Sequence, residues 1–168
     1  MLNQFSRTQL LLGKDNMDRL MNKLKNSRVA VFGIGGVGGY VAEALARSGV
    51  GSFVLVDDDK VCLTNLNRQI IATRKTVGKY KAEVMRDRIL EINPDAEVEV
   101  RKCFYLPENA DEFDFNEYSY VVDDYFGFLD DANNGEAGDH HAREGVRGTG
   151  HQQYGSRKQA RSDQIPGS

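Results

Sequence analysis

The chain has 168 residues, a formal net charge of −3 at neutral pH and a sequence pI of about 5.6. This length suffices for one domain with a hydrophobic core, and the charge balance gives no overall signature of nucleic-acid binding. The sequence also holds no paired cysteine motif, no apolar run near the roughly 20 residues of a membrane span and no signal-peptide pattern, so we expect a cytoplasmic protein without a membrane partner.

The first 123 residues alternate predicted helices with predicted strands. A capping box at Ser6–Gln9 and apolar residues at helical spacing predict N-terminal helices within 6–25. Further helices are expected within 38–49 and 78–93, and strands near 28–33, 52–57, 96–101 and 119–123. Because strands alternate with helices, we expect a doubly wound, mainly parallel α/β sheet.

The composition changes after the fourth predicted strand. From 124 to 168, large aliphatic residues and phenylalanines become sparse, while all three histidines and many glycines gather there. Such a segment buries too little apolar surface to offset the entropy lost on ordering. We therefore predict a nucleotide-binding domain at 1–123 and a disordered tail at 124–168, and we expect no metal site on the histidines.

A glycine-rich turn, "GIGGVGG", connects the first predicted strand with the helix that follows it. Gly33 permits a tight turn, Gly35 lets the backbone approach a phosphate, and Gly38 allows the helix to pack closely on the strand. With Gly36, these residues form a candidate phosphate site, to which the helix N-terminus adds partial positive charge. The pattern predicts a nucleotide-binding turn but does not separate NAD from ATP.

The loop after the second predicted strand favours ATP. Asp57 or Asp59, about 20 residues beyond the turn, is placed to accept hydrogen bonds from a ribose. Adenylation of a carboxylate also needs cations around the β and γ phosphates, whereas hydride transfer does not. Each of the following residues alone is typical of a solvated surface, but as an ordered set they supply that chemistry: Asn65, Arg68, Gln69 and Lys81.

Several motifs resemble those of a known enzyme superfamily. "GIGGVGG", "VDDD", "NLNRQ" and "GKYK" are similar, in order and spacing, to the E1-like enzymes that adenylate ubiquitin-like proteins and sulfur carriers. "FSRTQLLLG", "AEALARSGVG", "TNLNRQI" and "EINP" resemble more closely the bacterial tRNA threonylcarbamoyladenosine dehydratases, over about residues 4–123. Gly39 is commonly Ser in those enzymes, which is a mild departure. The resemblance implies a Rossmann-like sheet of the E1-like adenylating type, truncated here after the fourth strand.

The resemblance also implies an activity and residue roles. The expected reaction is ATP-dependent adenylation and cyclising dehydration of the threonylcarbamoyl carboxylate of a modified adenosine in tRNA. Arg7 matches an arginine that reaches the partner subunit's ATP, so the full-length parent is expected to be a homodimer. By position, Asp57 and Asp59 lie near the ribose and adenine, and the phosphates are surrounded by Asn65, Arg68, Gln69 and Lys81. Two alternatives stay open: an adenylating enzyme for a ubiquitin-like sulfur-carrier protein, and a non-catalytic nucleotide-binding docking module.

The resemblance ends abruptly beyond Asp123. The family has a further aspartate three residues on that helps hold Mg²⁺, whereas this chain has Phe126. Codons permitted for the last residues, read one nucleotide later, can encode a family-like strand and loop, so we expect a shifted reading frame. The chain as written is therefore expected not to catalyse. Cys62 and Cys103 are expected to be small half-buried thiols rather than acceptor nucleophiles.

Overall fold

The computed structural model describes residues 3–124 and 145–148. A single sheet of five strands has the order β3-β2-β1-β4-β5. Its strands are β1 (Arg28–Phe32), β2 (Ser52–Val56), β3 (Glu97–Arg101), β4 (Tyr120–Asp123) and β5 (Gly145–Gly148). The first four are parallel to one another, so the predicted α/β class is confirmed, and each lies within one residue of its predicted bounds.

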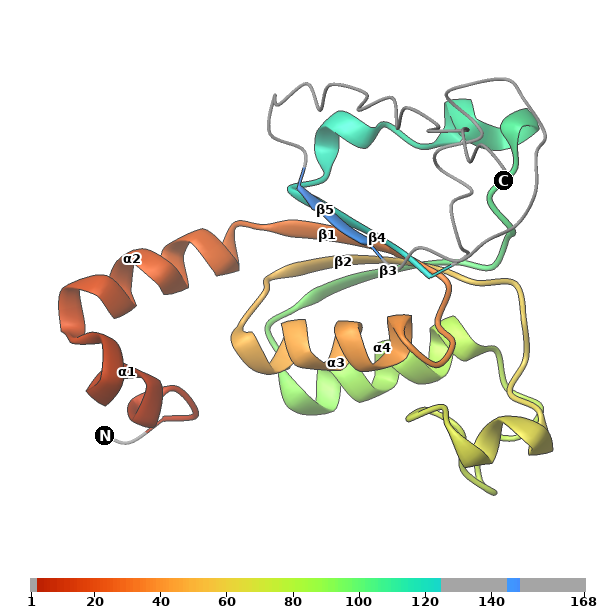
Figure 1. Cartoon of the computed structure of the whole chain (residues 1–168), viewed down its shortest axis with the longest axis horizontal. Coiled ribbons are helices and arrows are strands. Elements are labelled where there is room, and N and C mark those ends of the chain that lie inside the picture. The colour runs from red at the N-terminus through yellow and green to blue at the C-terminus, as the bar shows by residue number, and fades with distance from the viewer. Residues whose placement is uncertain (1–2, 125–144, 149–168) are drawn as a thin grey trace, which may run out of the picture.

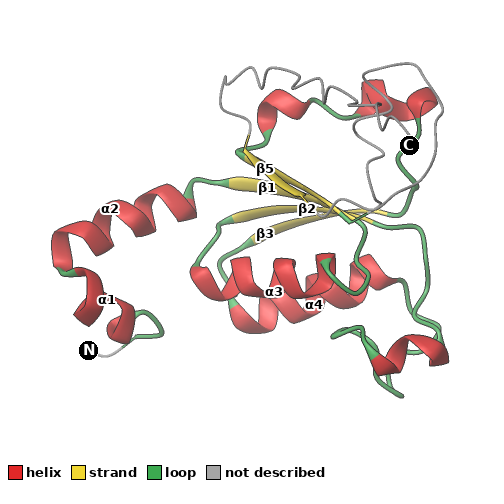
Figure 2. Ribbon diagram, in the orientation of Figure 1, coloured by secondary structure: helices red, strands yellow, loops and turns green. Residues whose placement is uncertain are grey.

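The α-helices of the described part lie on one face of this sheet or beside it (Figure 2). Two of them, α3 and α4, cover one face, and α1 and α2 form an arm that extends from the edge of the body (Figure 1). The four α-helices are α1 (Ser6–Leu12), α2 (Lys14–Lys25), α3 (Gly38–Ser48) and α4 (Lys81–Ile92). Three short 3₁₀ helices complete the described part: η1 (Leu63–Asn67), η2 (Pro107–Glu112) and η3 (Phe115–Glu117).

The helical face of the sheet holds the aliphatic core. Val29 and Val31 of β1, together with Phe53 and Leu55 of β2, are buried against α3 and α4. Strands that are buried on both faces are typical of a parallel sheet covered by crossover connections. Met85, near the middle of α4, is fully buried in the same cluster. This packing fixes the position of α3, whose N-terminus faces the candidate site.

An ion-pair cluster ties α3 to α4. Glu43 accepts hydrogen bonds from Arg47, one turn further along α3, and from Arg88 of α4. The bond from Arg88 is the main reason why the pKa of the Glu43 carboxyl lies below its ordinary value, although burial opposes this shift. The stability that this pairing contributes is present above the unfolded pKa and is lost as pH falls through the lowered folded pKa.

The opposite face of the sheet carries an aromatic cluster. The ring of Phe32 lies 5.3 Å from that of Tyr105 and 5.4 Å from that of Phe113. Phe115 stacks on Phe32 at 6.0 Å and contacts Tyr118 edge-on. In the described part of the chain, 3₁₀ helices and loops therefore cover this face in place of α-helices.

The predicted tail lies largely outside the described residues. Its two described parts are Asp124, which follows β4 directly, and β5, whose backbone pairs antiparallel with β4. The boundary at 123 and the disorder of the remaining tail stay predictions. Among the described helices, none has the length and apolarity needed to cross a membrane.

Candidate nucleotide-binding site

The glycine turn between β1 and α3 has the steric form that the sequence predicts. Gly33 adopts a positive φ of 87°, a conformation that favours glycine, and its N–H donates to the Val56 carbonyl oxygen at 2.9 Å. A Cβ on Gly38 would lie 1.9 Å from the Gly33 carbonyl oxygen, so no side chain fits there. A Cβ on Gly36 would meet nothing within 4 Å. The turn is therefore closed by backbone contact at one end and open at Gly36.

The anion-binding end of this turn already holds a carboxylate. Asp124 Oδ2 accepts a hydrogen bond from the Gly38 N–H at 3.0 Å. The same oxygen lies 3.1 Å from the place where a Cβ on Gly35 would stand. Amide groups at a helix N-terminus attract anions, so this contact is favourable. In this arrangement Asp124 takes the hydrogen bond that the sequence pattern reserves for a phosphate.

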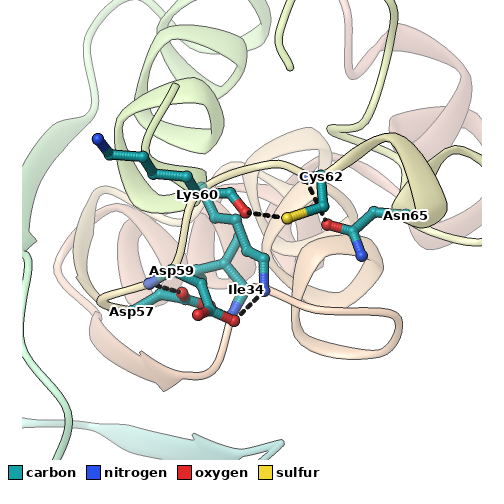
Figure 3. Close-up of polar contacts among 7 residues, drawn as sticks. Ile34, Asp57, Asp59, Lys60, Cys62 and Asn65 are labelled. Atoms are coloured by element: carbon teal, nitrogen blue, oxygen red, sulfur yellow. Dashed lines mark hydrogen bonds and ion pairs between the residues drawn. The ribbon is translucent and has the colours of Figure 1, made fainter. Parts of the chain in front are cut away.

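Asp57 braces the turn from the neighbouring strand. It follows β2, is only 2% exposed, and accepts from the Ile34 N–H at 2.7 Å and from the Asp59 N–H at 2.9 Å (Figure 3). Burial is the main cause that raises the pKa of the Asp57 carboxyl, while these hydrogen bonds and the charge of Lys81 act against the shift. Both carboxylate oxygens thus serve the protein's own backbone, a structural role that the sequence did not indicate.

Lys81 and Asp59 form an ion pair beside this brace. Lys81 Nζ lies 2.7 Å from Asp59 Oδ2, and the Lys81 N–H donates to the Asp59 carbonyl oxygen at 3.0 Å. The lysine side chain is 9% exposed, whereas the aspartate side chain is 68% exposed. Lys81 is the first residue of α4, so the helix fixes its ammonium group at the edge of the site. The pair presents a buried cation and a solvent-facing carboxylate within one contact.

The 3₁₀ helix η1 positions the remaining polar residues. Asn65 is buried, and its Oδ1 accepts from the Cys62 N–H at 2.9 Å, which closes the start of the helix (Figure 3). Arg68 is exposed, and its guanidinium donates to the Asn67 Oδ1 at 3.1 Å. Asn65 therefore shapes the loop, and Arg68 follows η1 with its charge open to solvent.

Gln69 supplies the polar atom that best fits a bound nucleotide. Its side chain is 7% exposed, and its Oε1 has no hydrogen-bond partner among the described residues. Its Nε2 lies 3.8 Å from the place of a Cβ on Gly35, so the amide stands next to the glycine turn. A buried polar atom without a partner is costly unless a ligand or water satisfies it. The orphan oxygen is an acceptor and fits a hydroxyl or amino donor of a nucleotide, whereas the open space at Gly36 and the Lys81 ammonium fit its phosphates.

The structure brings most of the predicted site residues to the carboxyl ends of β1 and β2. Arg7 is the exception, because α1 lies at the far end of the arm from η1 and the glycine turn (Figure 1). Cys62 is exposed rather than half-buried as expected, and Cys103 is of intermediate exposure. No group of three or more metal-ligating side chains occurs within 3–124 or 145–148, and Phe126 lies outside these residues.

Sequence reasoning missed the part played by Asp124. The reason is visible only in the strand order, because β4 pairs with β1 in parallel, with Phe32 opposite Asp123. The residue after β4 must then lie beside the turn that follows β1, where the Asp124 N–H donates to the Phe32 carbonyl oxygen at 2.8 Å. Ligands of open α/β sheets bind at such carboxyl ends, where the connections of neighbouring strands diverge.

Comparisons with known proteins agree with this geometry. The sequence model of the ThiF family matches residues 6–124. A tRNA threonylcarbamoyladenosine dehydratase of Bacillus subtilis (strain 168) is 50% identical over 123 residues, which are 73% of this chain and 47% of that protein. The sulfur carrier protein ThiS adenylyltransferase of Escherichia coli (strain K12) is 41% identical over 90 residues, which are 54% of this chain and 36% of that protein.

A solved structure extends the likeness to three dimensions. The crystal structure of the E. coli tRNA N6-threonylcarbamoyladenosine dehydratase TcdA in complex with ATP matches with a TM-score of 0.67 and 44% sequence identity. The match covers 73% of this chain and 49% of that chain. The chain thus spans about half the length of the dehydratases that it matches. Since the family match takes in well over half of its residues, the chain belongs to the ThiF family.

Proposed function

We propose that this chain contains the nucleotide-binding half of an ATP-dependent tRNA threonylcarbamoyladenosine dehydratase. The observation that carries the proposal is the juxtaposition of the glycine turn with the Lys81–Asp59 pair and the unsatisfied Gln69 oxygen. Relatives named as this dehydratase are 46% to 50% identical over the matching part, and one of them is known in complex with ATP. Adenylation is the chemistry that a phosphate-binding turn beside a fixed cation serves best.

Bound ATP would supply the adenylyl group that activates the threonylcarbamoyl carboxylate, with release of pyrophosphate. An internal nucleophile would then displace AMP, and the ring would close with net loss of water. The chain's own residues would bind and orient the nucleotide. The backbone of the glycine turn would approach the phosphates, and Lys81 would balance their charge. Asp59 would face the ribose, while Asp57 holds the turn in place. The phosphates would be bordered by these residues: Gly33, Gly35, Gly36, Gly38, Asn65, Arg68 and Gln69.

Mg²⁺ would enter with ATP rather than through a protein site of its own. The described residues hold no cluster of metal-ligating side chains, and the carboxylates of Asp57 and Asp124 at the turn are engaged by backbone amides. The aspartate that the resemblance implies for Mg²⁺ is replaced by Phe126. For this reason we propose that the 168-residue chain binds ATP but forms no measurable AMP.

A homodimer of the full-length parent belongs to the same proposal. The arm of α1 and α2 extends from the body, and Leu10 and Leu11 of α1 are each 86% exposed (Figure 1). Apolar side chains this exposed on a short helix favour burial against another surface. A second copy of the chain would bury them and bring Arg7 to its ATP. Sedimentation of the completed protein as a monomer at micromolar concentration would contradict this role of Arg7.

A sulfur-carrier substrate is the second candidate. The observation in its favour is the 41% identity to an adenylyltransferase that is named for the sulfur carrier protein ThiS. The glycine turn and the ion pair would serve either carboxylate equally well. The nucleotide site therefore does not distinguish the two substrates. The higher identity and coverage of the dehydratases support tRNA as the first candidate substrate. A substrate in tRNA also agrees with the expected cytoplasmic location.

The deciding experiment compares two substrates on one protein. A version of the chain completed after residue 123 with the family-like reading frame is incubated with ATP and either threonylcarbamoyl-modified tRNA or a carrier protein ending in Gly-Gly. AMP formation with tRNA alone is expected. Release of pyrophosphate with the carrier and not with tRNA, while AMP stays bonded to the carrier, would replace the proposal with the second candidate. No consumption of ATP with either substrate, while ATP still binds, would leave a nucleotide-binding docking module.

A further inference from the structure

One loop of the molecule has a charge unlike the rest of the chain. The basic loop, residues 60–80, contains five Lys and Arg residues and no Asp or Glu, in a chain of net charge −3. In Figure 1 it projects from the body below the carboxyl ends of β2 and β3. The loop carries these cations, all of them exposed: Lys60, Arg68, Arg74, Lys75 and Lys79.

The cations of the basic loop are left without carboxylate partners. All seven ion pairs within the described residues involve other basic side chains. Arg28, Arg47 and Arg88, for example, are each bound to a glutamate. In the described part of the chain, the basic side chains of β1, β3, α3 and α4 are thus paired with carboxylates, whereas the basic loop carries five unpaired cations and no carboxylate of its own. Such a local concentration of positive charge attracts a polyanion, even when the whole protein is acidic.

Backbone hydrogen bonds hold the basic loop in a defined shape. The Gly78 N–H donates to the Val61 carbonyl oxygen at 2.8 Å, and the Val61 N–H donates to the Lys79 carbonyl oxygen at 2.9 Å. At the tip, the Thr76 hydroxyl donates to the carbonyl oxygen of the buried Ile71 at 2.7 Å. Arg74 and Lys75 lie in that tip. A loop fixed in this way loses little entropy when it binds a ligand.

Tyr80 gathers two ammonium groups at the base of the loop, one from Lys60 of the loop and one from Lys102 outside it. Lys60 Nζ lies 4.9 Å and Lys102 Nζ lies 4.8 Å from the centre of its ring. Lys60 also directly follows Asp59, and Tyr80 directly precedes Lys81. The basic loop therefore begins and ends at the ion pair of the nucleotide site. A chain of phosphates bound along the loop would lead straight to that site.

We propose that the basic loop binds the phosphate backbone of RNA and so delivers the tRNA substrate to the nucleotide site. This inference rests on the proposed function for its choice of RNA. The residues agree with that choice, because lysine is depleted in protein–protein interfaces. In contrast, Lys and Arg spread over a surface supply the salt-dependent affinity for nucleic-acid phosphates. Arg74, Lys75 and Lys79 are the principal contacts, since they are remote in sequence from the glycine turn and bear no part of the nucleotide site.

The test measures binding of a fluorescently labelled tRNA transcript to the 168-residue chain by anisotropy between 50 and 200 mM salt. The variant Arg74→Ala/Lys75→Ala/Lys79→Ala is expected to bind about tenfold more weakly, with a log–log salt slope smaller by roughly two. The matched control is Lys23→Ala/Lys25→Ala on α2, where two exposed lysines lie outside the loop. It is expected to change the affinity less than about twofold. The charge-preserving variant Arg74→Lys/Lys75→Arg should bind tRNA as the wild type does.

Thermal melting and ATP binding are measured on every variant and are expected to stay at wild-type values. Wild-type affinity of the triple variant for tRNA would overturn the inference, as would an absence of tRNA binding by the unmodified chain. Loss of binding to phosphatidylserine vesicles with unchanged tRNA binding would also overturn it in favour of a membrane ligand. Loop-dependent tRNA binding by a protein that adenylates only the carrier would contradict the proposed function and leave RNA binding by the loop intact.

Discussion

The nucleotide site has two halves that are built in different ways. The glycine turn, residues 33–38, is made by backbone that packs on backbone. A Cβ added to Gly38 would lie only 1.9 Å from the Gly33 carbonyl oxygen. The loop half, residues 57–69 together with Lys81, is made by side chains that bind backbone amides or one another, such as Asp57 with Ile34 and Lys81 with Asp59. The glycine turn thus depends on the absence of side chains, and the loop half depends on the hydrogen bonds and ion pairs that its side chains form.

This difference predicts how each half responds to change. At Gly38 of the glycine turn an added methyl group must displace the main chain, so the response to substitution there is nearly all-or-none. In the loop half each side chain contributes a separable hydrogen bond or charge, so the responses are graded. Substitutions in the two halves should therefore differ in their effects on stability and ATP binding, from the largest expected effect in the glycine turn to the smaller ones in the loop half.

The largest effect is expected from Gly38→Ala. Its Cβ would overlap the Gly33 carbonyl oxygen, so that either the turn or the start of α3 must move. We expect a loss of about 3 kcal/mol or more in the free energy of unfolding and no detectable ATP binding. Urea denaturation and calorimetric titration with ATP measure the two quantities.

Gly36→Ala is the matched control for that substitution. Nothing lies within 4 Å of its Cβ position, and its φ is not among the positive values of the described glycines. We expect a change in the free energy of unfolding of less than about 1 kcal/mol. Equal destabilisation by the two alanines would show that the turn is not closed by the Gly33–Gly38 contact.

Asp57→Ala should produce the next largest effect. It removes the acceptor for the N–H groups of Ile34 and Asp59, each worth about 1 to 3 kcal/mol when left unsatisfied. We expect a loss of about 2 to 4 kcal/mol in the free energy of unfolding, measured by urea denaturation. Asp57→Asn keeps one oxygen acceptor and should lose about half as much. If both variants retain wild-type stability, Asp57 does not brace the turn.

The same residue gives a pH dependence of known sign. Because burial raises the pKa of Asp57 above its unfolded value, its contribution to stability is present below the unfolded pKa and is lost as pH rises through the folded pKa. The stability of the wild type relative to Asp57→Asn should therefore increase as the pH is lowered. The opposite slope would mean that hydrogen bonding outweighs burial in setting the pKa of this carboxyl.

These two halves also differ in how far the sequence predicts them. The roles of Gly33 and Gly38 follow from strand–turn–helix spacing, because only glycine tolerates the positive φ and the close backbone approach found there. The strand bounds were predictable for a related reason, since short apolar runs between turn residues leave little choice of length. Local sterics and hydrophobic pattern are encoded in neighbouring residues, which is why sequence alone captures them.

The loop half was predicted as a list of residues but not as a set of contacts. Asp57 or Asp59 was expected to accept hydrogen bonds from a ribose, but the sequence did not predict that both oxygens of Asp57 bind backbone amides. The contact between Asp124 and Gly38 joins residues 86 positions apart and depends on the pairing of β4 with β1. Partners of this kind follow from the order of strands in the sheet, which no local pattern specifies.

A smaller effect is expected from Lys81→Met in the loop half. Methionine keeps the buried alkyl stem but removes the charge that pairs with Asp59 and that also lowers the pKa of Asp57. We expect ATP to bind about tenfold more weakly, with little change in stability. Lys79→Met, two residues earlier and exposed, is the control for the loss of one charge. An equal loss of ATP affinity in both variants would mean that Lys81 acts only through the net charge of the loop.

The smallest effect is expected at Asp124, which follows β4. Its substitution should raise the affinity for ATP, whereas Gly38→Ala and Lys81→Met should lower it. The Gly38 N–H at the start of α3 donates its hydrogen bond to Asp124 Oδ2. A bound phosphate would accept a hydrogen bond from this same N–H group. A phosphate must displace this carboxylate and overcome its repulsion. Asp124→Ala should therefore strengthen ATP binding about fivefold, or about 1 kcal/mol, as for a charge at a helix N-terminus.

Two further variants separate the causes of this gain. Asp124→Asn keeps an oxygen acceptor but removes the charge. Its affinity for ATP should therefore lie between the affinities of the wild type and of Asp124→Ala. Asp58→Ala removes an exposed carboxylate of the same loop half that the structure places in no hydrogen bond with the turn, and it should leave the affinity nearly unchanged. Calorimetric titration at two salt concentrations measures all three. If Asp124→Ala and Asp58→Ala strengthen ATP binding equally, the gain comes from general charge reduction, and Asp124 does not compete with the nucleotide for the glycine turn.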